Sequence, residues 1–423
     1  MASPRLLVIA PWLPKLSETF VYREVLGLRA LGVEVISASV HDPGDQWREP
    51  ALRQLAEQAI PVYGAGPMAM LVEALKELPR RPRQTLSTLA LALGDALGAR
   101  ELRPLARLKI LWQCLGGLAL ASRLRGREPD HLHAQMAHVS TSIAMYAARQ
   151  MGLGFSFSGH AADLFRDASL LKQKLQRADF VRCISHWHRA FYQSLVPRPD
   201  QDYPVVRCGV PLDGPQRQPD RALKSPPLLL GVGRLVPKKG FDLLIRAVAL
   251  VRAAGQACQC RILGDGPEAA ALQALVTELG LTGVVELAGA RDNPEILATL
   301  PEADLFVLPC RTDATGDKDG IPVVLMEAMA SGLCCVSGDL DTIRELIQDG
   351  ESGFLVPGED VEALAGRILR LLQDPDLREG TARRGQAWVR QEFGLEPNLR
   401  RFQQALRHAS PRRHPGRDPR AGS

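Results

Sequence analysis

The stretch PLLLGVGRLVPKKGFDLLIRAVALVRAAG, Pro227 to Gly255, shows how this chain is expected to fold. A short apolar run is followed by a glycine-rich basic loop and then by apolar residues at helical spacing. The same order of strand, loop and helix recurs downstream, ending with CCVSG and the expected helix TIRELIQ. Apolar strands without alternation that are joined by helices predict a doubly wound parallel sheet covered on both faces.

The first part of the chain shows the same alternation of strands and helices. A helix is expected over residues 21–32, between the first two strands, and residues 51–127 hold three or four helical segments rich in Leu, Ala and Arg. We interpret the latter as a helical insertion that packs on its own domain or lies on a membrane surface. The strands expected in this part are RLLVIA, VEVISASV, DHLHA, FSFSGH, FVRCIS and YPVVRCGV.

The stretch from Pro211 to Pro227 is rich in proline and charge and has no periodicity, which places a domain boundary there. With 423 residues the chain is long enough for two domains. We expect an N-terminal domain, a linker, a C-terminal domain, a terminal helix that crosses back to the first domain, and a basic disordered tail. Their bounds are 1–212, 213–227, 228–390, 391–410 and 411–423.

The charge balance argues against nucleic acid as a partner. The net charge is +5, and the final segment PRRHPGRDPRAGS, with four Arg and one Asp, supplies +3 of it. A nucleic-acid-binding domain would carry its basic excess on folded elements. The 8 Cys have no metal-ligand spacing and are expected to be reduced packing residues. The apolar run at the start is too short for a signal peptide, so we expect a cytoplasmic protein.

The loop GVGRLVPKKG is the first candidate binding site. Its glycines allow a ligand to approach the backbone, and Arg234 and Lys239 place two cations at the carboxyl end of a strand, where phosphates bind in such sheets. Taken alone, the loop is more often a solvated basic turn. The third small residue of the dinucleotide fingerprint is missing, because Val236 occupies its place.

GDGPEA, Gly264 to Ala269, does fit the pattern G-x-G-x-x-A between a strand and a helix, with Glu286 about twenty residues further on. This keeps a nucleotide-binding oxidoreductase open as an alternative. Short glycine patterns are common between strands and helices, and Pro267 lies within this one.

Two further patterns contain candidate ligand residues. DKD at Asp317 to Asp319 and DLD at Asp339 to Asp341 have the form of a two-acid metal motif, but such tripeptides arise by chance, so no metal is assigned. FSGHAADLF places His160 directly after an expected strand, where a ligand contact and a satisfied core histidine are equally plausible. Asp163 in the same segment fits a loop or helix-cap position.

Together, GR-x4-KG, the D-x7-E of DGIPVVLMEAMASG and ESGFLVPGED resemble the retaining, nucleotide-sugar-dependent glycosyltransferases of the GT-B fold, the "group 1" family. The resemblance covers the second domain. SETFVYREVLGLRALGVEV, HLHAQMA and FSGHAADLF are similar to the branch that builds bacterial exopolysaccharides of the colanic-acid type. The resemblance implies two Rossmann-like domains facing across a cleft.

The resemblance also implies roles for individual residues. Glu327 would bind the nucleotide ribose, Asp319 and His160 the donor sugar, and Arg234 and Lys239 the diphosphate as the main catalytic cations. The remaining donor-binding residues would be Gly233, Gly264, Gly320, Ile321 and, near the base, Arg291. The acceptor-side residues would be Ser17, Glu18 and Asp163.

The function implied by the resemblance is a retaining hexosyltransferase of class EC 2.4 that moves a sugar from a nucleoside diphosphate to a growing glycan in exopolysaccharide synthesis. The acceptor would be lipid-linked and met at the inner membrane face, with peripheral contact to anionic lipid and no cofactor or metal. The family usually has Glu where this chain has Asp319, which leaves a sugar-nucleotide-binding protein without turnover as a further alternative.

Overall fold

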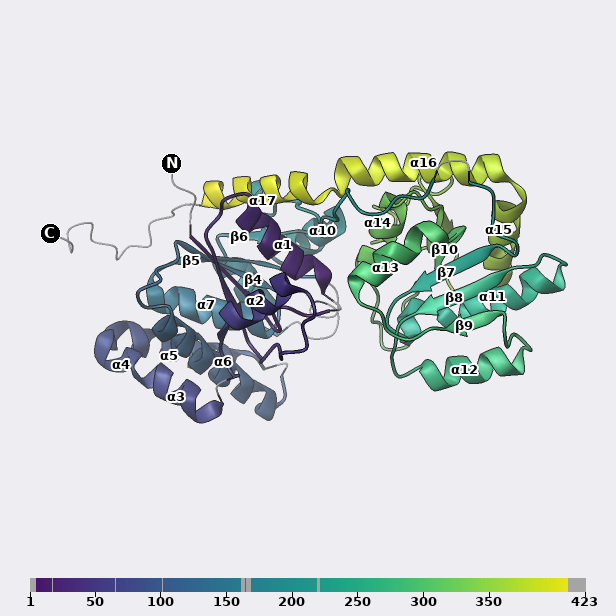
Figure 1. The fold of residues 1–423 in the computed structure, drawn as a ribbon. Coiled ribbons are helices and arrows are strands. Elements are labelled where there is room, and N and C mark those ends of the chain that lie inside the picture. Colours follow the sequence, from purple (N-terminus) through teal and green to yellow (C-terminus); the bar gives the residue numbers. More distant parts are fainter. Residues whose placement is uncertain are drawn as a thin grey trace. The chain divides into compact units, whose positions relative to one another are not determined.

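The computed structural model describes residues 5–16, 18–64, 66–100, 102–160, 164, 169–218 and 221–409. The chain divides into two compact units. The first consists of Met1–Val206 with Leu399–Ser423, and the second of Arg207–Asn398. Each unit contains a six-stranded sheet whose strands are all parallel, with helices around it (Figure 1). The predicted doubly wound α/β architecture is confirmed in both units.

The sheet of the first unit has the order β3-β2-β1-β4-β5-β6, so the chain changes direction between β1 and β4. Its strands are β1 Leu6–Ala10, β2 Val35–Ser39, β3 Ile60–Pro61, β4 His131–Gln135, β5 Gly154–Ser158 and β6 Phe180–Arg182. The helices are α1 Thr19–Ala30, α2 Pro50–Gln58, α3 Pro67–Leu75, α4 Glu77–Arg80, α5 Pro82–Gly98, α6 Pro104–Arg123, α7 Val139–Met151, α9 Leu171–Arg177 and α10 His186–Leu195. The expected insertion at residues 51–127 thus contains α2 to α6.

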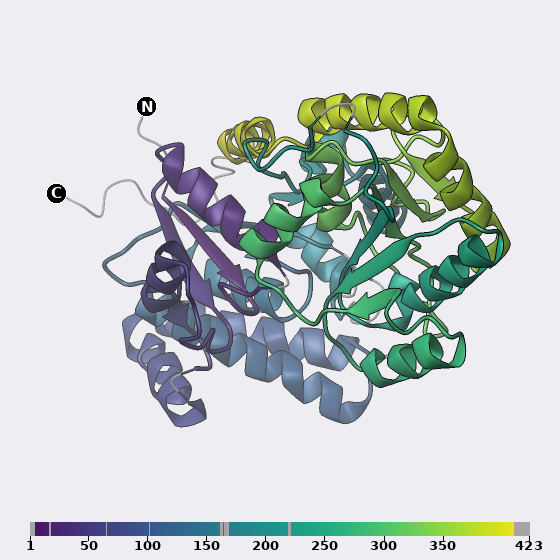
Figure 2. The ribbon, with the colours of Figure 1, turned by 45° about the vertical axis from the view of Figure 1, so that its right-hand side comes forward.

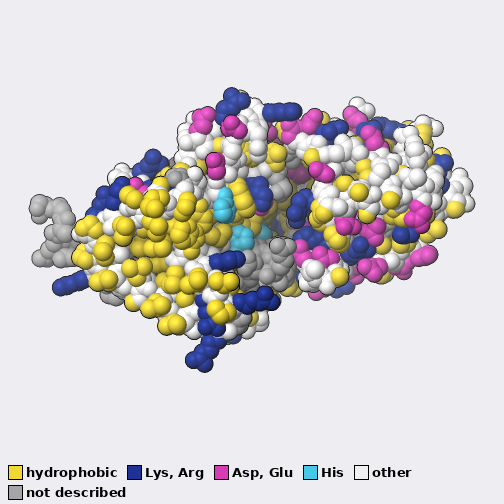
Figure 3. Space-filling view, turned by 90° about the horizontal axis from the view of Figure 1, so that it is seen from below, with side chains coloured by type: hydrophobic (Ala, Val, Ile, Leu, Met, Phe, Trp, Pro, Cys, Tyr) yellow, Lys and Arg dark blue, Asp and Glu magenta, His cyan; other side chains and the backbone are white. Residues whose placement is uncertain are grey.

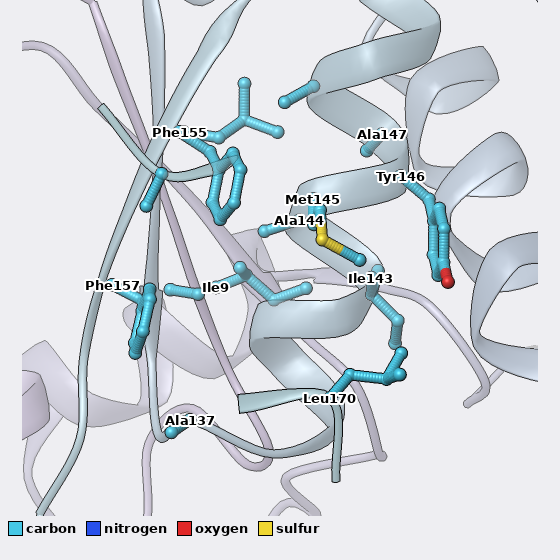
Figure 4. Close-up of a cluster of buried hydrophobic side chains, with 14 of the residues drawn as sticks. Ile9, Ala137, Ile143, Ala144, Met145, Tyr146, Ala147, Phe155, Phe157 and Leu170 are labelled. Carbon is cyan, nitrogen blue, oxygen red and sulfur yellow. The ribbon is translucent and has the colours of Figure 1, made fainter. Parts of the chain in front are cut away.

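The two faces of this sheet differ in chemistry. On one face, α7 packs beside Phe155 and Phe157 of β5, with Ala144 on the side of the helix that is turned toward this strand (Figure 4). Because side chains alternate along a strand, β4 places Leu132 and Ala134 in that core and turns His131, His133 and Gln135 to the opposite face. His133 and Gln135 on this second face are buried and His131 is partly buried, so these side chains need hydrogen-bond partners within the protein.

Helix α17, Leu395–Ala409, contributes its later residues to the first unit. Leu399 lies against α1 at Gly27, where a side-chain Cβ would come within 2.4 Å of it. The ring of Phe402 meets the ring of His133 edge-on at 4.7 Å between centroids. The terminal helix therefore covers part of the polar face of the first sheet.

The sheet of the second unit has the order β12-β11-β10-β7-β8-β9. Figures 1 and 2 show this unit, coloured from green to yellow, from two directions. Its strands are β7 Leu228–Val232, β8 Gln259–Leu263, β9 Val285–Leu287, β10 Leu305–Leu308, β11 Cys335–Gly338 and β12 Phe354–Val356. The helices are α11 Phe241–Ala253, α12 Ala269–Glu278, α13 Asn293–Thr299, α14 Val323–Ala330, α15 Val361–Gln373 and α16 Pro375–Glu392. β7 and β8 run in register from Leu228 opposite Gln259 to Val232 opposite Leu263.

Two expectations about individual elements are wrong, and one strand was missed. YPVVRCGV forms no strand, because it leaves the edge of β6 after Val206 and its Val210 then bonds with Phe393 and Leu395 in the second unit. TIRELIQ forms turns rather than a helix. Its backbone N–H groups bond partly to carbonyls three residues back and partly to carbonyls four residues back, so no continuous helical ladder forms. ESGFLVPGED contains the strand β12, which was not expected.

The boundary between the units lies ahead of the expected linker 213–227. Arg207 donates to Glu345 at 2.9 Å, and Arg217 donates to Glu379 at 2.8 Å. Both arginine side chains are buried, so these charged pairs hold residues 207–217 firmly on the second unit. The 8 cysteines, all within the described part of the chain, are buried free thiols.

Candidate active site in the second unit

The strand order of the second unit brings several loops to one edge of the sheet. The chain starts at the central strand β7, proceeds to β8 and β9 on one side, and then crosses to β10, β11 and β12 on the other. Because the strands are parallel, the loops after β7 and β10 leave from the same edge and turn in opposite directions. Ligands of doubly wound sheets bind at such a switch point.

The glycine turns after β7 and β8 are locked together by their backbones. Leu235 donates its N–H to the carbonyl of Asp265 at 2.9 Å and accepts from the N–H of Glu268 at 3.0 Å. A Cβ on Gly264 would lie 1.8 Å from the carbonyl oxygen of Gly233, and φ at Gly264 is +154°. These contacts require glycine for packing between two protein loops. They account for GDGPEA without a dinucleotide, so the oxidoreductase alternative is not favoured.

Lys239 and Asp319 form an ion pair across the switch point. Lys239 follows β7, Asp319 follows β10, and the Lys239 Nζ lies 2.7 Å from Asp319 Oδ2. Lys238, which the sequence reading did not single out, lies 3.4 Å from the other oxygen of the same carboxylate and 3.1 Å from Asp317. The side chains of Lys239 and Asp319 are each 13% exposed, so the pair is shielded from water yet open on one side.

The ion pair keeps both partners charged. Burial by itself raises the pKa of Asp319, but the ammonium groups of Lys239 and Lys238 outweigh it and lower that pKa below its ordinary value. Burial lowers the pKa of Lys239, but Asp319 more than compensates, so the pKa of Lys239 is raised. The thiol of Cys310 donates to Asp319 at 3.3 Å, and burial followed by the charge of Asp319 raises its pKa, which keeps the donor protonated.

The loop that carries Asp319 is fixed from several sides. Thr342 donates its hydroxyl to the backbone carbonyl of Asp319 at 2.8 Å. Gly240 has φ of +67°, and a Cβ there would lie 2.1 Å from the carbonyl oxygen of Pro309, so the loops after β7 and β10 also touch. The acid and its lysine are therefore positioned by close backbone packing rather than by the ion pair alone.

The acids of the DKD and DLD patterns have cationic partners. Asp317 and Asp319 pair with lysines, and the guanidinium of Arg344 donates to Asp339 at 2.6 Å and 2.8 Å. Among the described residues, no group of three or more His, Cys, Asp or Glu side chains is arranged to hold a metal ion.

The other predicted cations of the site are exposed. Arg234 lies on the loop after β7, and its positive charge opposes the protonation of Lys239. Arg291 follows β9 and donates to the carbonyl of its neighbour Ala290 at 3.1 Å. Both guanidinium groups can therefore reorient toward a ligand at little energetic cost.

Glu327 lies on α14 and is 6% exposed. The buried carboxylate accepts a hydrogen bond from Asn293 at 3.2 Å, and Asn293 is the first residue of α13. α13 is itself anchored by a reciprocal capping box between Asp292 and Glu295. The sequence predicted ribose hydroxyls as partners of Glu327 and did not predict the contact with Asn293.

Gly320 and Ile321 lie just ahead of α14, before its cap residue Pro322. The first backbone N–H groups of α14 have no partner within the helix.

His160 follows β5 in the first unit and is 8% exposed. Its Nε2 lies 3.0 Å from Gln135 Oε1, and Gln135 donates its amide to Glu24 at 2.6 Å. Because the amide nitrogen of Gln135 is committed to Glu24, its oxygen must face His160, which makes His160 Nε2 the protonated nitrogen. Glu24 in turn pairs with the buried Arg182.

The backbone around His160 is equally constrained. The ring of His188 donates to the carbonyl of His160 at 2.9 Å, and the ring of Phe20 packs on His160 at 4.4 Å. A Cβ on the preceding Gly159 would lie 2.3 Å from the Tyr192 hydroxyl. The partners Gln135, Glu24 and Arg182 were missed, although HLHAQ carries polar residues at alternate positions of a strand.

Of the acceptor-side residues, the structure describes only Glu18. It accepts from Lys15 at 2.5 Å directly before α1. Ser17 and Asp163 lie outside the described residues.

The architecture agrees with solved structures over nearly the whole chain. Sucrose-phosphate synthase from Thermosynechococcus elongatus superimposes with a TM-score of 0.73 at 20% identity, covering 96% of this chain and 98% of that chain. HepE of Anabaena, solved in complex with UDP, gives 0.68 at 17% identity, covering 96% of this chain and 100% of that chain. The chain thus has the GT-B fold that the sequence predicted.

The sequence comparison identifies the second unit further. Residues 215–388 match the family described as "Glycosyl transferases group 1", so this segment is a group 1 glycosyltransferase domain. WcaL of Salmonella typhimurium, whose name assigns it to colanic acid biosynthesis, is 37% identical over 229 residues, 53% of this chain and 55% of that protein. The amylovoran biosynthesis glycosyltransferase AmsK of Erwinia amylovora is 39% identical over 175 residues, 41% of this chain and 43% of that protein. The chain thus spans about half the length of these relatives.

Proposed function

We propose that this protein transfers a sugar from a nucleoside diphosphate donor to a glycan acceptor in exopolysaccharide synthesis, with retention of anomeric configuration. The observation that carries the proposal is the ion-paired cluster of Lys239, Lys238 and Asp319 at the switch point of a group 1 glycosyltransferase domain. The similarity to WcaL and AmsK, both named for exopolysaccharide synthesis, supports the class of product.

The charges of the cluster suit a diphosphate. Arg234, Lys238 and Lys239 supply three positive charges and Asp317 and Asp319 two negative ones, which leaves 3 − 2 = +1 at the mouth of the switch point. The amino-terminal end of α14 adds a partial positive charge. An anionic donor would be held by this excess, while Asp319 offers its carboxylate to the hydroxyls of the sugar.

The chemical step follows from these positions. The bond between the anomeric carbon and the phosphate oxygen breaks, and its electron pair leaves with the diphosphate. Lys239 and Arg234 stabilise the charge that grows on the leaving group, a contribution of roughly 3–4 kcal/mol for each such donor. The acceptor hydroxyl bonds to the anomeric carbon on the same face and gives its proton to the departing phosphate oxygen. His160 hydrogen-bonds the donor sugar and does not act as the base.

The proposal includes no metal ion, because the lysines supply the charge that a metal would otherwise bring to the phosphates. On nucleotide binding, the buried carboxylate of Glu327 would accept hydrogen bonds from the ribose hydroxyls. Arg291 lies on the loop after β9 and would meet the base. The acceptor is proposed to be a lipid-linked oligosaccharide.

The first test is a thermal-shift screen of UDP-, GDP- and ADP-sugars. A donor at 100 times its dissociation constant stabilises the folded state by about 2.7 kcal/mol. The donor found is then supplied in labelled form with a lipid-linked oligosaccharide, and the configuration of the product is read by NMR. Donor binding without transfer to any acceptor would favour the alternative of a sugar-nucleotide-binding protein, and no nucleotide binding would refute the proposal.

A further inference from the structure

The helices of the insertion in the first unit expose an apolar surface that their packing does not explain. α3, α5 and α6 each direct large apolar side chains to solvent at helical spacing: Met68 and Val72, Leu93 and Leu97, and Leu105 and Leu108. We call these six side chains the insertion face. Met68 is 71% exposed and Leu105 is 78% exposed.

The insertion face is separate from the core of its unit. The opposite sides of α5 and α6 bury Ala92, Ala96, Ile110 and Cys114 in that core, so these helices are apolar on both sides. In the described part of the second unit, Leu250 is the one large apolar side chain of comparable exposure, at 39%. Contiguous apolar surface on a folded protein marks a contact site.

The exposed charges described around the insertion face are mainly cations. Its carboxylates are turned inward: Glu77 pairs with Arg125, Asp95 pairs with Arg177, and Glu73, the most exposed of them at 24%, pairs with Lys76. The remaining carboxylate of residues 66–112, that of Glu101, lies outside the described residues. Exposed cations remain at the ends and edges of the helices, among them Arg81, Arg83, Arg100, Arg103 and Lys109. Figure 3 shows the apolar cluster of the first unit with Lys and Arg near it.

We propose that the insertion face docks on a bilayer surface that contains anionic lipid. Leu, Met and Val side chains flanked by Lys and Arg match the apolar boundary and the negative headgroups of such a surface. No described helix has the length and hydrophobicity to cross a bilayer, so the contact lies in the plane of the interface. The insertion face belongs to the first unit and the switch-point cluster to the second, and the proposed contact does not depend on the proposed transfer reaction.

The same charge pattern disfavours a second copy of this chain as the occupant. A two-fold dimer would bring the insertion face against itself, because such an interface uses the same patch on both subunits. The exposed cations would then face one another, while the described carboxylates of these helices, those of Glu73, Glu77 and Asp95, are already paired with cations of the same subunit. Like charges placed opposite each other oppose association.

The test is co-sedimentation of the full chain with phosphatidylcholine vesicles, with and without phosphatidylglycerol, at low and high salt. Leu97→Ser removes a side chain that is 64% exposed and is expected to lower the partition coefficient about tenfold. Its matched control is Leu250→Ser, an exposed leucine of the second unit. Neither change touches the core, so both variants should fold.

Two charge-reversal double variants distinguish attraction of the insertion face to anionic lipid from the effect of the protein's net charge. Arg83→Glu with Lys109→Glu is expected to lower partitioning by at least 25-fold, since each cation near an anionic surface is worth about fivefold. Arg246→Glu with Arg252→Glu on α11 changes the net charge equally, at exposed positions of the second unit, and should bind like the wild type. Residues 411–423 are the same in all variants, so their arginines cannot account for a difference in vesicle binding between a variant and its control.

The proposal predicts pelleting that requires phosphatidylglycerol, weakens with salt, and is lost in the insertion-face variants alone. Absence of such pelleting in the wild type, or equal pelleting of the variants and their controls, would overturn it. Sedimentation velocity without vesicles provides the remaining outcome. A dimer that Leu97→Ser dissociates would overturn the bilayer in favour of a second copy.

Discussion

The ammonium of Lys239 and the carboxylate of Asp319 lie 2.7 Å apart, on loops that follow different strands of the second sheet. Each lowers the free energy of the charged form of the other. The stability from the lowered pKa of Asp319 is present above pH 3.8 and is lost as the pH falls through its folded value. That from the raised pKa of Lys239 is present below pH 10.5 and is lost as the pH rises through its folded value. The pair is therefore charged throughout the physiological range.

Replacement of Lys239 and of Arg234 should separate stability from turnover. Lys239→Ala leaves Asp319 with Lys238 alone and should lower the free energy of unfolding by about 2–3 kcal/mol. Arg234→Ala removes an exposed side chain and should change that free energy by less than about 0.5 kcal/mol. Both variants should lower kcat by about 10²–10³ if both cations stabilise the leaving diphosphate. Urea unfolding and steady-state kinetics provide the two measurements. A rise in KM with an unchanged kcat in either variant would contradict this role.

Glu327 tests the nucleotide-binding assignment. Glu327→Ala removes the carboxylate that would accept from two ribose hydroxyls and should weaken nucleoside diphosphate binding by about 10–100-fold, because a hydrogen bond to a charged group is worth about 1.5–3 kcal/mol. Glu327→Asp should retain part of the affinity. Calorimetric titration measures both. The control Asn293→Ala leaves the carboxylate in place and should affect affinity less, whereas wild-type affinity in Glu327→Ala would refute the assignment.

Gly264 tests whether the GDGPEA turn serves packing. Gly264→Ala places a methyl group against the carbonyl of Gly233 and should destabilise the second unit by about 3 kcal/mol or more. Gly366→Ala in α15 of the same unit meets no atom within 4 Å. This control should be stabilising by about 0.5–1 kcal/mol, because alanine is the better helix former. Thermal unfolding distinguishes the two. A Gly264→Ala variant as stable as the wild type would show that the turn tolerates a side chain.

The histidines of β4 predict acid sensitivity of the first unit. Burial lowers the pKa of His131 from 6.5 to about 4, so the unfolded chain takes up a proton first as the pH falls. Stability is therefore lost as the pH drops from about 6.5 toward 4, by roughly 3 kcal/mol from this group. His133, also buried, shifts in the same direction. His131→Gln should reduce the slope of stability against pH in urea unfolding at pH 7, 6 and 5. An unchanged slope would assign the effect to other groups.

The local pattern of apolar residues was sufficient to predict much of the fold. Apolar runs such as LLVIA and LLLGV are strands because parallel sheets bury both faces, and the helices between them follow from apolar residues at helical spacing. The pattern failed where long-range contacts decide. YPVVRCGV has the composition of a strand, but its two halves bond to different units, so it cannot continue one ladder.

The candidate residues were readable from the sequence, but their partners were not. Arg234, Lys239, Asp319 and Glu327 follow from motif spacing, because each lies at a fixed distance from the end of a strand or on a short helix. That Lys239 pairs with Asp319, that Asn293 meets Glu327, and that Gln135 fixes the tautomer of His160 depends on strand order and helix placement. The sequence determined which chemical groups are present at the strand ends. The tertiary structure alone decided which of them meet, because it brings loops from distant parts of the chain to the same edge of a sheet.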